Sequence, residues 1–393
     1  MSYTSQELRQ RYVELEHGMR QPGSVLFSQA RYEIVRQLGE GGMGLTFLAD
    51  ELSAADLKRP VVLKFVKDSL DPHRLAQFLK EVQLSVLFNH PNLISVYRLE
   101  SEVIQADDNS SLVRQRRRLR GHTVYYSVMQ FIDGWNLRQI VNRLRQVRIV
   151  LHQDITMYSI ARVARGLHYV HEYRNESGEH LALAHRDVSP ENILVDRFGR
   201  IKVSDFGIAM ATKRERGGGF MHAGNLRYCA PEQLSGATLD RRCDIYNIGL
   251  LLYLLFTNMD RFGPEIGERD ARDRIRRKMV RSALPDLGRV HPRCAAICER
   301  CLREDPAARY QNCEDLANDI DLYLQENQKV VTNDQIEEML HELFSPNPLF
   351  VSPRFVPLTG SDVLEQQDFD PARLPATPEP AGPVATTPLP PVI

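Results

Sequence analysis

The segment His185-Arg186-Asp187-Val188-Ser189-Pro190-Glu191-Asn192 is followed, thirteen residues after Asn192, by Asp205-Phe206-Gly207 and further on by Ala230-Pro231-Glu232. Upstream of all three lie a glycine-rich turn and a lysine within an apolar run. Single short motifs often match by chance, but this ordered set is too specific for that. The set therefore decides how the rest of the chain is interpreted.

The upstream segments contain the groups that nucleotide phosphates require. In Leu38-Gly39-Glu40-Gly41-Gly42-Met43-Gly44 the missing side chains would let backbone amides approach phosphates closely. The segment lacks the G-K-[ST] ending of a P-loop and no helix follows it, which disfavours both a P-loop and a dinucleotide site. Lys64 lies in an apolar run, where a cation needs an anionic partner. Glu81 can be that partner, although two unrelated surface charges would look the same.

Hydrophobic periodicity divides the chain into a strand-rich first part and a helical second part. Alternating apolar residues predict a hairpin over residues 31–49 whose turn is the glycine-rich segment. Further strand-like runs cover residues 60–66, 93–99 and 124–131. Asp71 and Pro72 begin one helix, whose apolar stripe comprises Leu75, Phe78, Leu79, Val82 and Val86. After Gly134 the spacing becomes helical.

Three later segments have helical patterns of their own. Residues 245–257 predict a helix buried on all sides, because the run is shorter than the roughly 20 residues that span a bilayer. Cys294, Cys298 and Cys301 share one helical face; they could be metal ligands, but without a second pair or suitably spaced histidines a buried face is favoured. Residues 333–344 predict a short amphipathic helix that packs on the main domain or on a partner.

Composition and charge describe an ordinary globular protein. The chain has 393 residues, of which 42% are hydrophobic and 26% charged, enough to bury a sizeable core. With 50 basic and 51 acidic residues it gives no electrostatic reason to expect nucleic acid or an anionic membrane as a partner. The first 20 residues lack the apolar core of a secretory signal, so we expect a cytoplasmic protein.

The whole motif set resembles that of eukaryotic-type (Hanks-type) serine/threonine protein kinases, over roughly Tyr32 to Tyr323. The catalytic segment is similar to that of a bacterial subset that reads H-R-D-V-S-P. The resemblance implies an α+β, bilobed protein-kinase fold, with a small antiparallel-sheet N-lobe containing one helix and a larger, mainly helical C-lobe. It also implies two cofactors, ATP and Mg²⁺, and protein substrates.

The expected domain organisation follows from this resemblance and from composition. The kinase domain covers residues 31–325, with an N-lobe over 31–132 and a C-lobe over 133–325. Residues 1–30 form an N-terminal helical extension and residues 326–344 a short C-terminal helix. Residues 345–393 hold 12 of the 22 prolines and predict a disordered tail. Residues 100–123, rich in arginine, predict a solvated insertion or, alternatively, a docking site for an acidic partner.

The resemblance assigns a role to each matching residue. Asp187 would orient the substrate hydroxyl and accept its proton, while Asn192 and Asp205 would hold the magnesium ions. Lys64 would bind the α- and β-phosphates, positioned by Glu81. The hinge that presents backbone groups to adenine would be residues 130–132, and Met129 would line the back of the adenine pocket. The nucleotide-binding set is then Leu38, Gly39, Glu40, Gly41, Gly42, Met43, Gly44, Lys64, Met129, Gln130 and Ile132.

Two positions bear on activity and specificity. Ser189 stands where serine/threonine kinases usually carry a lysine that touches the γ-phosphate, so one cation of the transition state is missing. Glu191 stands where tyrosine kinases place an arginine, which argues against tyrosine specificity. The leading interpretation is therefore a non-specific serine/threonine protein kinase. The alternatives are a pseudokinase that acts as an ATP-binding or docking module, supported by Ser189, and a small-molecule phosphotransferase.

Overall fold

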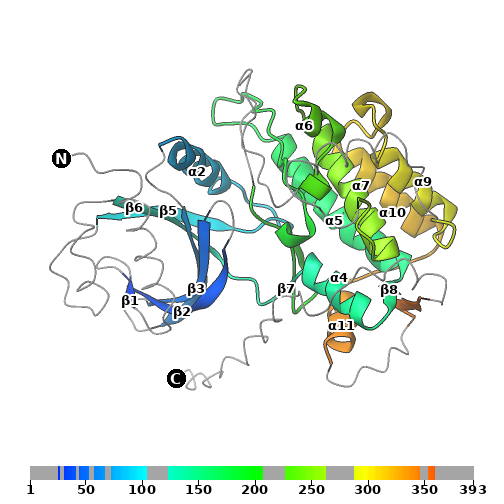
Figure 1. Ribbon diagram of the computed structural model, residues 1–393, viewed down its shortest axis with the longest axis horizontal. Coiled ribbons are helices and arrows are strands. Elements are labelled where there is room, and N and C mark those ends of the chain that lie inside the picture. Colours follow the sequence, from blue (N-terminus) through cyan, green and yellow to red (C-terminus); the bar gives the residue numbers. More distant parts are fainter. Residues whose placement is uncertain are drawn as a thin grey trace, which may run out of the picture. The chain divides into compact units, whose positions relative to one another are not determined.

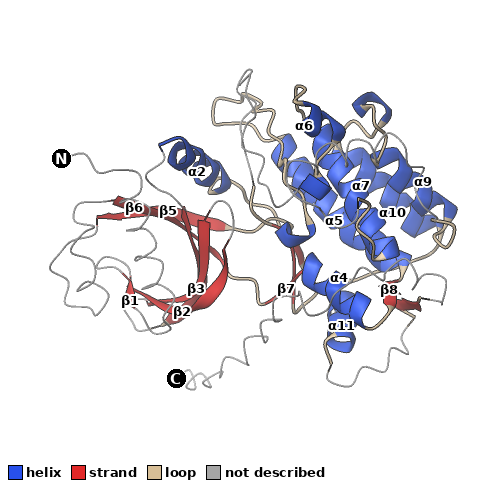
Figure 2. Cartoon of the chain, in the orientation of Figure 1, coloured by secondary structure: helices blue, strands red, loops and turns tan. Residues whose placement is uncertain are grey.

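The computed structural model describes residues 25–26, 31–40, 44–52, 57–66, 72–103, 123–206, 226–262, 287–345 and 353–358 (Figures 1 and 2). The chain forms two compact units, each discontinuous in sequence. The first comprises Met1–Phe131, Gly166–Asp187 and Ser204–Asp244. The second comprises Ile132–Arg165, Val188–Val203 and Ile245–Ile393. The segments 166–187 and 204–244, which the sequence assigns to the C-lobe, thus cluster with the first unit.

The first unit is built on an antiparallel six-stranded sheet with the order β1-β2-β3-β4-β6-β5. Its strands are β1 (Val25–Leu26), β2 (Arg31–Glu40), β3 (Gly44–Leu52), β4 (Lys58–Val66), β5 (Val96–Val103) and β6 (Thr123–Gln130). The predicted hairpin corresponds to β2 and β3, which join across the glycine-rich segment. The predicted antiparallel-sheet N-lobe is confirmed.

One helix, α2 (Pro72–Ser85), contacts β4 and β5 of this sheet (Figure 1). Phe78 and Val82 are buried against Val66, as the predicted apolar stripe requires. Strand residues alternate between faces, so Leu63 and Phe65 enter the core of the other face while Lys64 projects on the side of α2. The sheet thereby places a lysine where a helix carboxylate can reach it.

Several sequence predictions differ from the structure at their edges. Val25 and Leu26, which the sequence places in a helical extension, form β1 because their backbone pairs with Tyr32 and Glu33. Val86 lies beyond the end of α2 and is 38% exposed. The rest of the extension, Asp71 and most of the predicted arginine-rich insertion lie outside the described residues.

The second unit contains two small sheets, one of order β10-β9-β7 and one that pairs β11 with β8. The strands are β7 (Gly134–Asn136), β8 (Ile149–Leu151), β9 (Ile193–Asp196), β10 (Ile201–Val203) and β11 (Phe355–Pro357). Its helical elements are α4 (Leu137–Gln146), η1 (Pro190–Asn192), α9 (Pro292–Cys301), η3 (Pro306–Ala308), α10 (Cys313–Glu326) and α11 (Asn333–Leu343). The mainly helical character predicted for this part of the chain is confirmed.

Two long helices contribute residues to both units, α5 (Gln153–His171) and α7 (Arg242–Thr257). The short elements η2 (Leu226–Tyr228) and α6 (Pro231–Ser235) belong to the first unit. As predicted, the apolar run of α7 is buried on all sides from Ile245 to Phe256. Cys294, Cys298 and Cys301 are fully buried on one face of α9, which supports the core interpretation. No helix in the described part of the chain is both long and apolar enough to cross a lipid bilayer.

The predicted disordered tail is partly ordered. Phe355–Pro357 forms β11, whose backbone pairs with Ile149–Leu151 of β8. A proline-rich composition predicts disorder when a segment has no partner, and here the partner is a strand about 200 residues away in sequence. The remainder of the tail lies outside the described residues.

We expect Gly134→Ala to destabilise the protein by about 1–3 kcal/mol. A Cβ atom at position 134 would lie 2.1 Å from the carbonyl oxygen of Val195 on the paired strand β9, so β7 would have to move. Thermal unfolding measures the change. Gly39→Ala is the control, since a Cβ there has nothing within 4 Å. Equal thermal midpoints for the two variants would contradict the close approach of β7 and β9.

Candidate active site

Lys64 is the centre of a buried charge cluster in the first unit. Its strand β4 lies between β3 and β6, where Lys64 is paired with Thr46 and Ser127. The Lys64 side chain is 11% exposed, and its Nζ lies 2.6 Å from Asp205 Oδ1 and 3.7 Å from Glu81 Oε1. The two carboxylates come from α2 and from the segment after β10. The predicted partner of Lys64 is therefore adjacent to it, and Asp205 is closer still.

The electrostatics of this cluster follow from burial and from these contacts. Burial disfavours the charged form of Lys64, but the carboxylates of Asp205 and Glu81 outweigh it and raise the pKa of the ammonium. Burial likewise opposes ionisation of Asp205, and the adjacent Lys64 ammonium lowers the pKa of that carboxyl below its usual value. Burial raises the pKa of Glu81 to about 7 despite the attraction of Lys64. Lys64 and Asp205 thus form the firmly ionised pair.

Asp205 is held in place by its neighbour Phe206. The backbone of Asp205 has φ 54°, in the left-handed region that non-glycine residues rarely adopt. The next ring, Phe206, is 2% exposed and packs on His185 at 4.9 Å and on Phe88 at 5.5 Å between ring centroids. This aromatic packing fixes the chain on one side of Asp205, and the ion pair with Lys64 fixes its carboxylate.

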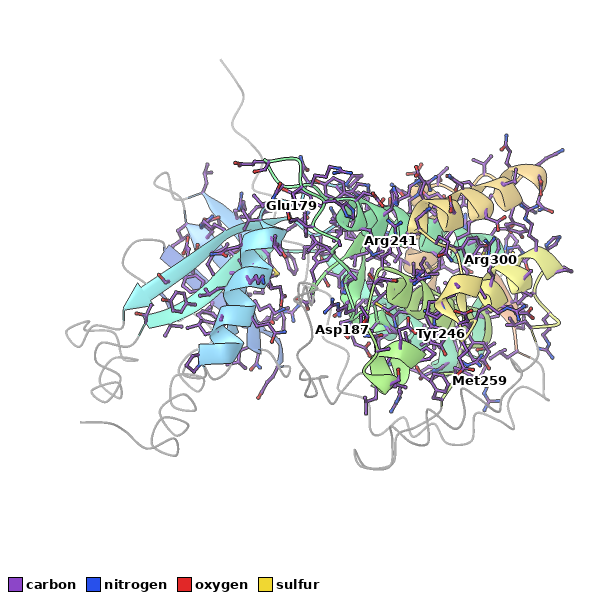
Figure 3. The ribbon with its side chains drawn as sticks, turned by 90° about the horizontal axis from the view of Figure 1, so that it is seen from above. Glu179, Asp187, Arg241, Tyr246, Met259 and Arg300 are labelled. Atoms are coloured by element: carbon purple, nitrogen blue, oxygen red, sulfur yellow. The ribbon has the colours of Figure 1, made fainter. Side chains whose placement is uncertain are left out.

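The loop that carries Asp187 is anchored by a buried carboxylate, Asp244 (Figure 3 labels Asp187). Asp244 accepts hydrogen bonds of 2.7 Å from the backbone N–H groups of His185 and Arg186, and its Oδ2 lies 2.7 Å from His171 Nε2. Arg186 has φ 65°, so the two bonds hold a strained turn. Since Asp187 follows directly, its backbone position depends on Asp244.

His185 connects this loop to the segment before Asp205. Its Nε2 lies 3.0 Å from the carbonyl oxygen of Ser204, and its Nδ1 accepts the N–H of Asp187 at 3.3 Å. The negative charge of Asp187 also raises the pKa values of Lys64 and Glu81. The first unit therefore brings together four predicted site residues, Lys64, Glu81, Asp187 and Asp205.

Asn192 and Ile132 belong to the second unit. Asn192 ends η1, is 8% exposed, and donates its backbone N–H to the carbonyl oxygen of Ser189 at 3.0 Å. Glu191, also in η1, accepts a hydrogen bond of 2.9 Å from Arg138 Nε of α4. Ser189 is fully buried, and within the described part of the chain its hydroxyl has no hydrogen-bond partner.

The predicted nucleotide-binding segments are described in part. Leu38, Gly39 and Glu40 form the exposed end of β2, and Gly44 begins β3, whereas residues 41–43 lie outside the described residues. Met129 is 8% exposed on β6. The backbone N–H of Gln130 donates to the carbonyl oxygen of Ser95 at 2.8 Å. The structure thus positions both strands that flank the glycine-rich segment.

Two supporting residues were missed by the sequence reasoning. Asp244 directly precedes the apolar run 245–257, and its charge at the edge of that run was the available signal. Phe88 lies just after α2 and contacts the rings of Phe206, Tyr169 and Tyr173. Its pattern in sequence is that of any core aromatic, so no local signal identifies it.

The donor set suits a hard cation. Asp205 and Asn192 offer carboxylate and amide oxygens, which Mg²⁺ prefers. The carboxyl group of Asp205 is 44% exposed, so it remains accessible beside Lys64. In the described part of the chain there is no cluster of three or more histidine, cysteine or acidic side chains that would form a complete protein cage. By its chemistry and its exposure, Asp205 can serve as a ligand of a hard cation.

Comparison with known proteins identifies the family. Residues 32–319 match the family model described as protein kinase domain. The chain is 31% identical over 303 residues to the tyrosine-protein kinase MasK of Myxococcus xanthus, covering 75% of this chain and 43% of that protein. It is 28% identical over 322 residues to the serine/threonine-protein kinase PrkC of Bacillus subtilis, with 79% and 43% covered. For the serine/threonine-protein kinase PknB of Mycolicibacterium smegmatis the identity is 30% over 296 residues, with 74% and 42% covered. The matches span less than half the length of each of these relatives.

We expect Asp244→Asn to cost about 3 kcal/mol of folding stability, because an amide cannot accept from both backbone N–H groups while facing His171. Burial opposes ionisation of Asp244, but hydrogen bonds from His171 and the backbone lower its pKa. A lowered pKa stabilises the folded state above the unfolded value of about 3.9 and loses that contribution as pH falls below it. Chemical unfolding at pH 7 and between about pH 2 and 5 measures both effects.

Asp240→Asn is the matched control for this measurement. Asp240 precedes the same helix, but its carboxylate is 50% exposed and pairs with Arg242 at the surface. We expect its replacement to cost less than about 1 kcal/mol. If the two variants lose the same stability at pH 7, Asp244 does not anchor the loop.

Proposed function

The chain belongs to the protein kinase domain family, and from this premise we propose that it transfers the γ-phosphate of ATP to serine or threonine hydroxyls of proteins. The observation that carries the proposal is the buried Lys64, whose ammonium lies between Asp205 and Glu81. Burying a lysine is costly unless it is paired, and the two carboxylates hold the Lys64 ammonium in one place, as protein kinases hold the lysine that binds phosphates. The relatives PrkC and PknB, both named serine/threonine-protein kinases, support the same conclusion.

The proposed mechanism relies on positioning and on charge. The Asp187 carboxylate accepts a hydrogen bond from the substrate hydroxyl and orients its oxygen. It takes the proton as that oxygen bonds to the γ-phosphorus of ATP and the bond to the leaving group, ADP, breaks. The Lys64 ammonium binds the α- and β-phosphates, and Glu81 keeps it there. The Lys64 ammonium has three N–H donors, so it can donate to phosphate oxygens while it stays paired with a carboxylate. Asp205 and Asn192 would then hold Mg²⁺, which supplies charge neutralisation on the phosphates.

Serine and threonine specificity is the finer part of the proposal. Glu191, four residues after Asp187, is paired with Arg138 at 2.9 Å, so this position carries a carboxylate where tyrosine kinases place an arginine. The relative MasK bears the name tyrosine-protein kinase, which makes the acceptor residue the point to measure.

A pseudokinase is the second candidate, and Ser189 is the observation that favours it. The Ser189 side chain is fully buried, so it cannot replace a lysine at the γ-phosphate. Loss of one stabilising charge typically costs about 10²–10³-fold in rate without abolishing chemistry. The complete set of Lys64, Glu81, Asp187, Asn192 and Asp205 favours an active enzyme.

The test is transfer of labelled phosphate from ATP with Mg²⁺, to the protein itself and to a generic basic protein. We expect wild type to transfer label and Asp187→Asn to lose about 10²–10⁴-fold in rate, because the hydroxyl loses its proton acceptor. Acid hydrolysis should place the label on serine and threonine. Asp240→Asn, which removes a surface carboxylate in the same unit, should leave the rate unchanged.

Three other outcomes would contradict the proposal in different ways. Label on tyrosine would overturn the specificity. No label in wild type, with nucleotide bound and label regained in Ser189→Lys, would establish the pseudokinase. Label on a metabolite but never on protein would indicate a small-molecule phosphotransferase.

A further inference from the structure

The chain continues past the matched kinase domain into a folded segment, which we call the C-terminal strap: residues 332–345 and 353–358. It begins with α11, whose N-terminus is closed by a capping box of Thr332 and Gln335. One face of α11 is buried in full, with Ile336, Met339, Leu340 and Leu343 each at most 2% exposed. The strap is therefore part of the core of the second unit.

Side chains of the second unit hold both ends of α11, which lies beside α4 (Figure 1). At its start, Tyr158 of α5 donates its hydroxyl to Asn333 Oδ1 at 3.0 Å. At its end, Arg143 Nε of α4 donates to the carbonyl oxygen of Leu343 at 3.0 Å, where a helix has free carbonyls and partial negative charge. Both contacts are directional, so they fix the helix in one orientation.

Phe344, the residue after α11, forms an aromatic stack with the second unit. Phe344 stacks on Trp135 of β7, with ring centroids 4.4 Å apart and planes inclined by 6°. Aromatic pairs of this kind contribute about 0.5–1.5 kcal/mol beyond their buried area. Trp135 also lies on the short strand that follows the predicted hinge. The strap thus contacts the chain three residues after Ile132, the last residue of the predicted hinge.

The second half of the strap, residues 353–358, binds to β8 by backbone hydrogen bonds. β11 pairs with β8, and the pairing is extended by His152 N–H to the carbonyl oxygen of Arg354 at 2.6 Å and by Leu358 N–H to that of Arg148 at 3.0 Å. Phe355 is 7% exposed. β8 follows α4 by two residues, so the strap holds α4 from both of its ends.

The elements that the strap contacts are those that hold Asn192. Strand β7 pairs with β9, which begins at the residue after Asn192. Helix α4 contacts η1, the turn that carries Asn192, and Arg138 of α4 bonds Glu191 there. The strap is therefore connected to Asn192 in two ways, through β7 and β9 and through α4 and η1, and all of these elements belong to the second unit.

We propose that the C-terminal strap positions Asn192, with Phe344 as the positioning residue that acts through Trp135 and β7. The role of Asn192 as a ligand of Mg²⁺ rests on the proposed function, whereas the docking of the strap does not. A positioning role predicts an effect on Mg²⁺-dependent binding. A merely stabilising role predicts an effect on unfolding alone.

Trp135 makes the first measurement direct, because it is the one tryptophan in the sequence. Phe344→Ala should shift its fluorescence emission to longer wavelength, as water replaces the stacked ring. Phe344→Tyr keeps the ring and should preserve the wild-type emission. Val356→Ala, in the same strap but at a side chain that is 40% exposed, is the control. An unchanged emission in Phe344→Ala would overturn the docked strap.

The second measurement is calorimetric binding of a non-hydrolysable ATP analogue over a series of Mg²⁺ concentrations. Phe344→Ala should need about tenfold more Mg²⁺ for half-maximal enhancement of affinity, the effect typical of residues that orient a metal ligand. Binding in EDTA should be unchanged, because Lys64 lies in the first unit. Arg143→Gln, which removes the bond to Leu343, should cause a smaller shift in the same direction and serves if Phe344→Ala unfolds.

The outcomes distinguish failure of the positioning role from failure of the proposed function. An emission shift with an unchanged Mg²⁺ requirement would overturn the positioning role. Wild-type protein that binds the analogue equally with Mg²⁺ and with EDTA would overturn the proposed function, and with it the role given to Asn192. The emission measurement would still decide whether the strap is docked.

Discussion

The first unit depends on one buried carboxylate that is satisfied almost entirely by backbone and histidine. Asp244 holds the N–H groups of His185 and Arg186, and these bonds fix the turn from which Asp187 projects. His185 in turn meets Ser204 and Phe206, which precede and follow Asp205. Asp205 then meets Lys64. A series of short contacts thus joins the start of α7, the Asp187 loop, the Asp205 segment and strand β4, and of the residues in it Asp205 stays partly exposed.

This arrangement explains how the protein can hold strained and charged groups where chemistry needs them. Arg186 and Asp205 both adopt left-handed backbone, which costs energy and persists only when the surroundings fix it. Burying the Lys64 ammonium also costs energy, because the charge loses its hydration, and the two carboxylates beside it offset that cost. Pre-organised charges of this kind stabilise developing charge without reorganising during the reaction.

The sequence predicted those parts of the fold that depend on local pattern or on motif. The hairpin around the glycines, the buried helix from Ile245, the cysteine face of α9 and the amphipathic helix near residue 340 are all present, because each buries a face that its own spacing defines. Two strands were missed because they are too short for a periodic signal: β1, which pairs with its neighbour β2, and β11, which pairs with the distant β8. Phe88 was missed because its sequence pattern is that of any buried aromatic residue. For the candidate site, the motif located Lys64, Glu81 and Asp205, while the anchoring role of Asp244 needed the fold. The roles of the site residues stay predictions.

The discontinuity of the first unit has a consequence for how the chain is made. Its sheet, α2, the Asp187 loop and Asp244 come from three stretches, the last of which ends at Asp244. During synthesis the sheet emerges early, but the contacts that close around Asp205 cannot form until residue 244 has left the ribosome. Contacts over such sequence separations form slowly and leave apolar surface exposed meanwhile. We therefore expect the nascent N-terminal sheet to keep apolar surface exposed until residue 244 has emerged.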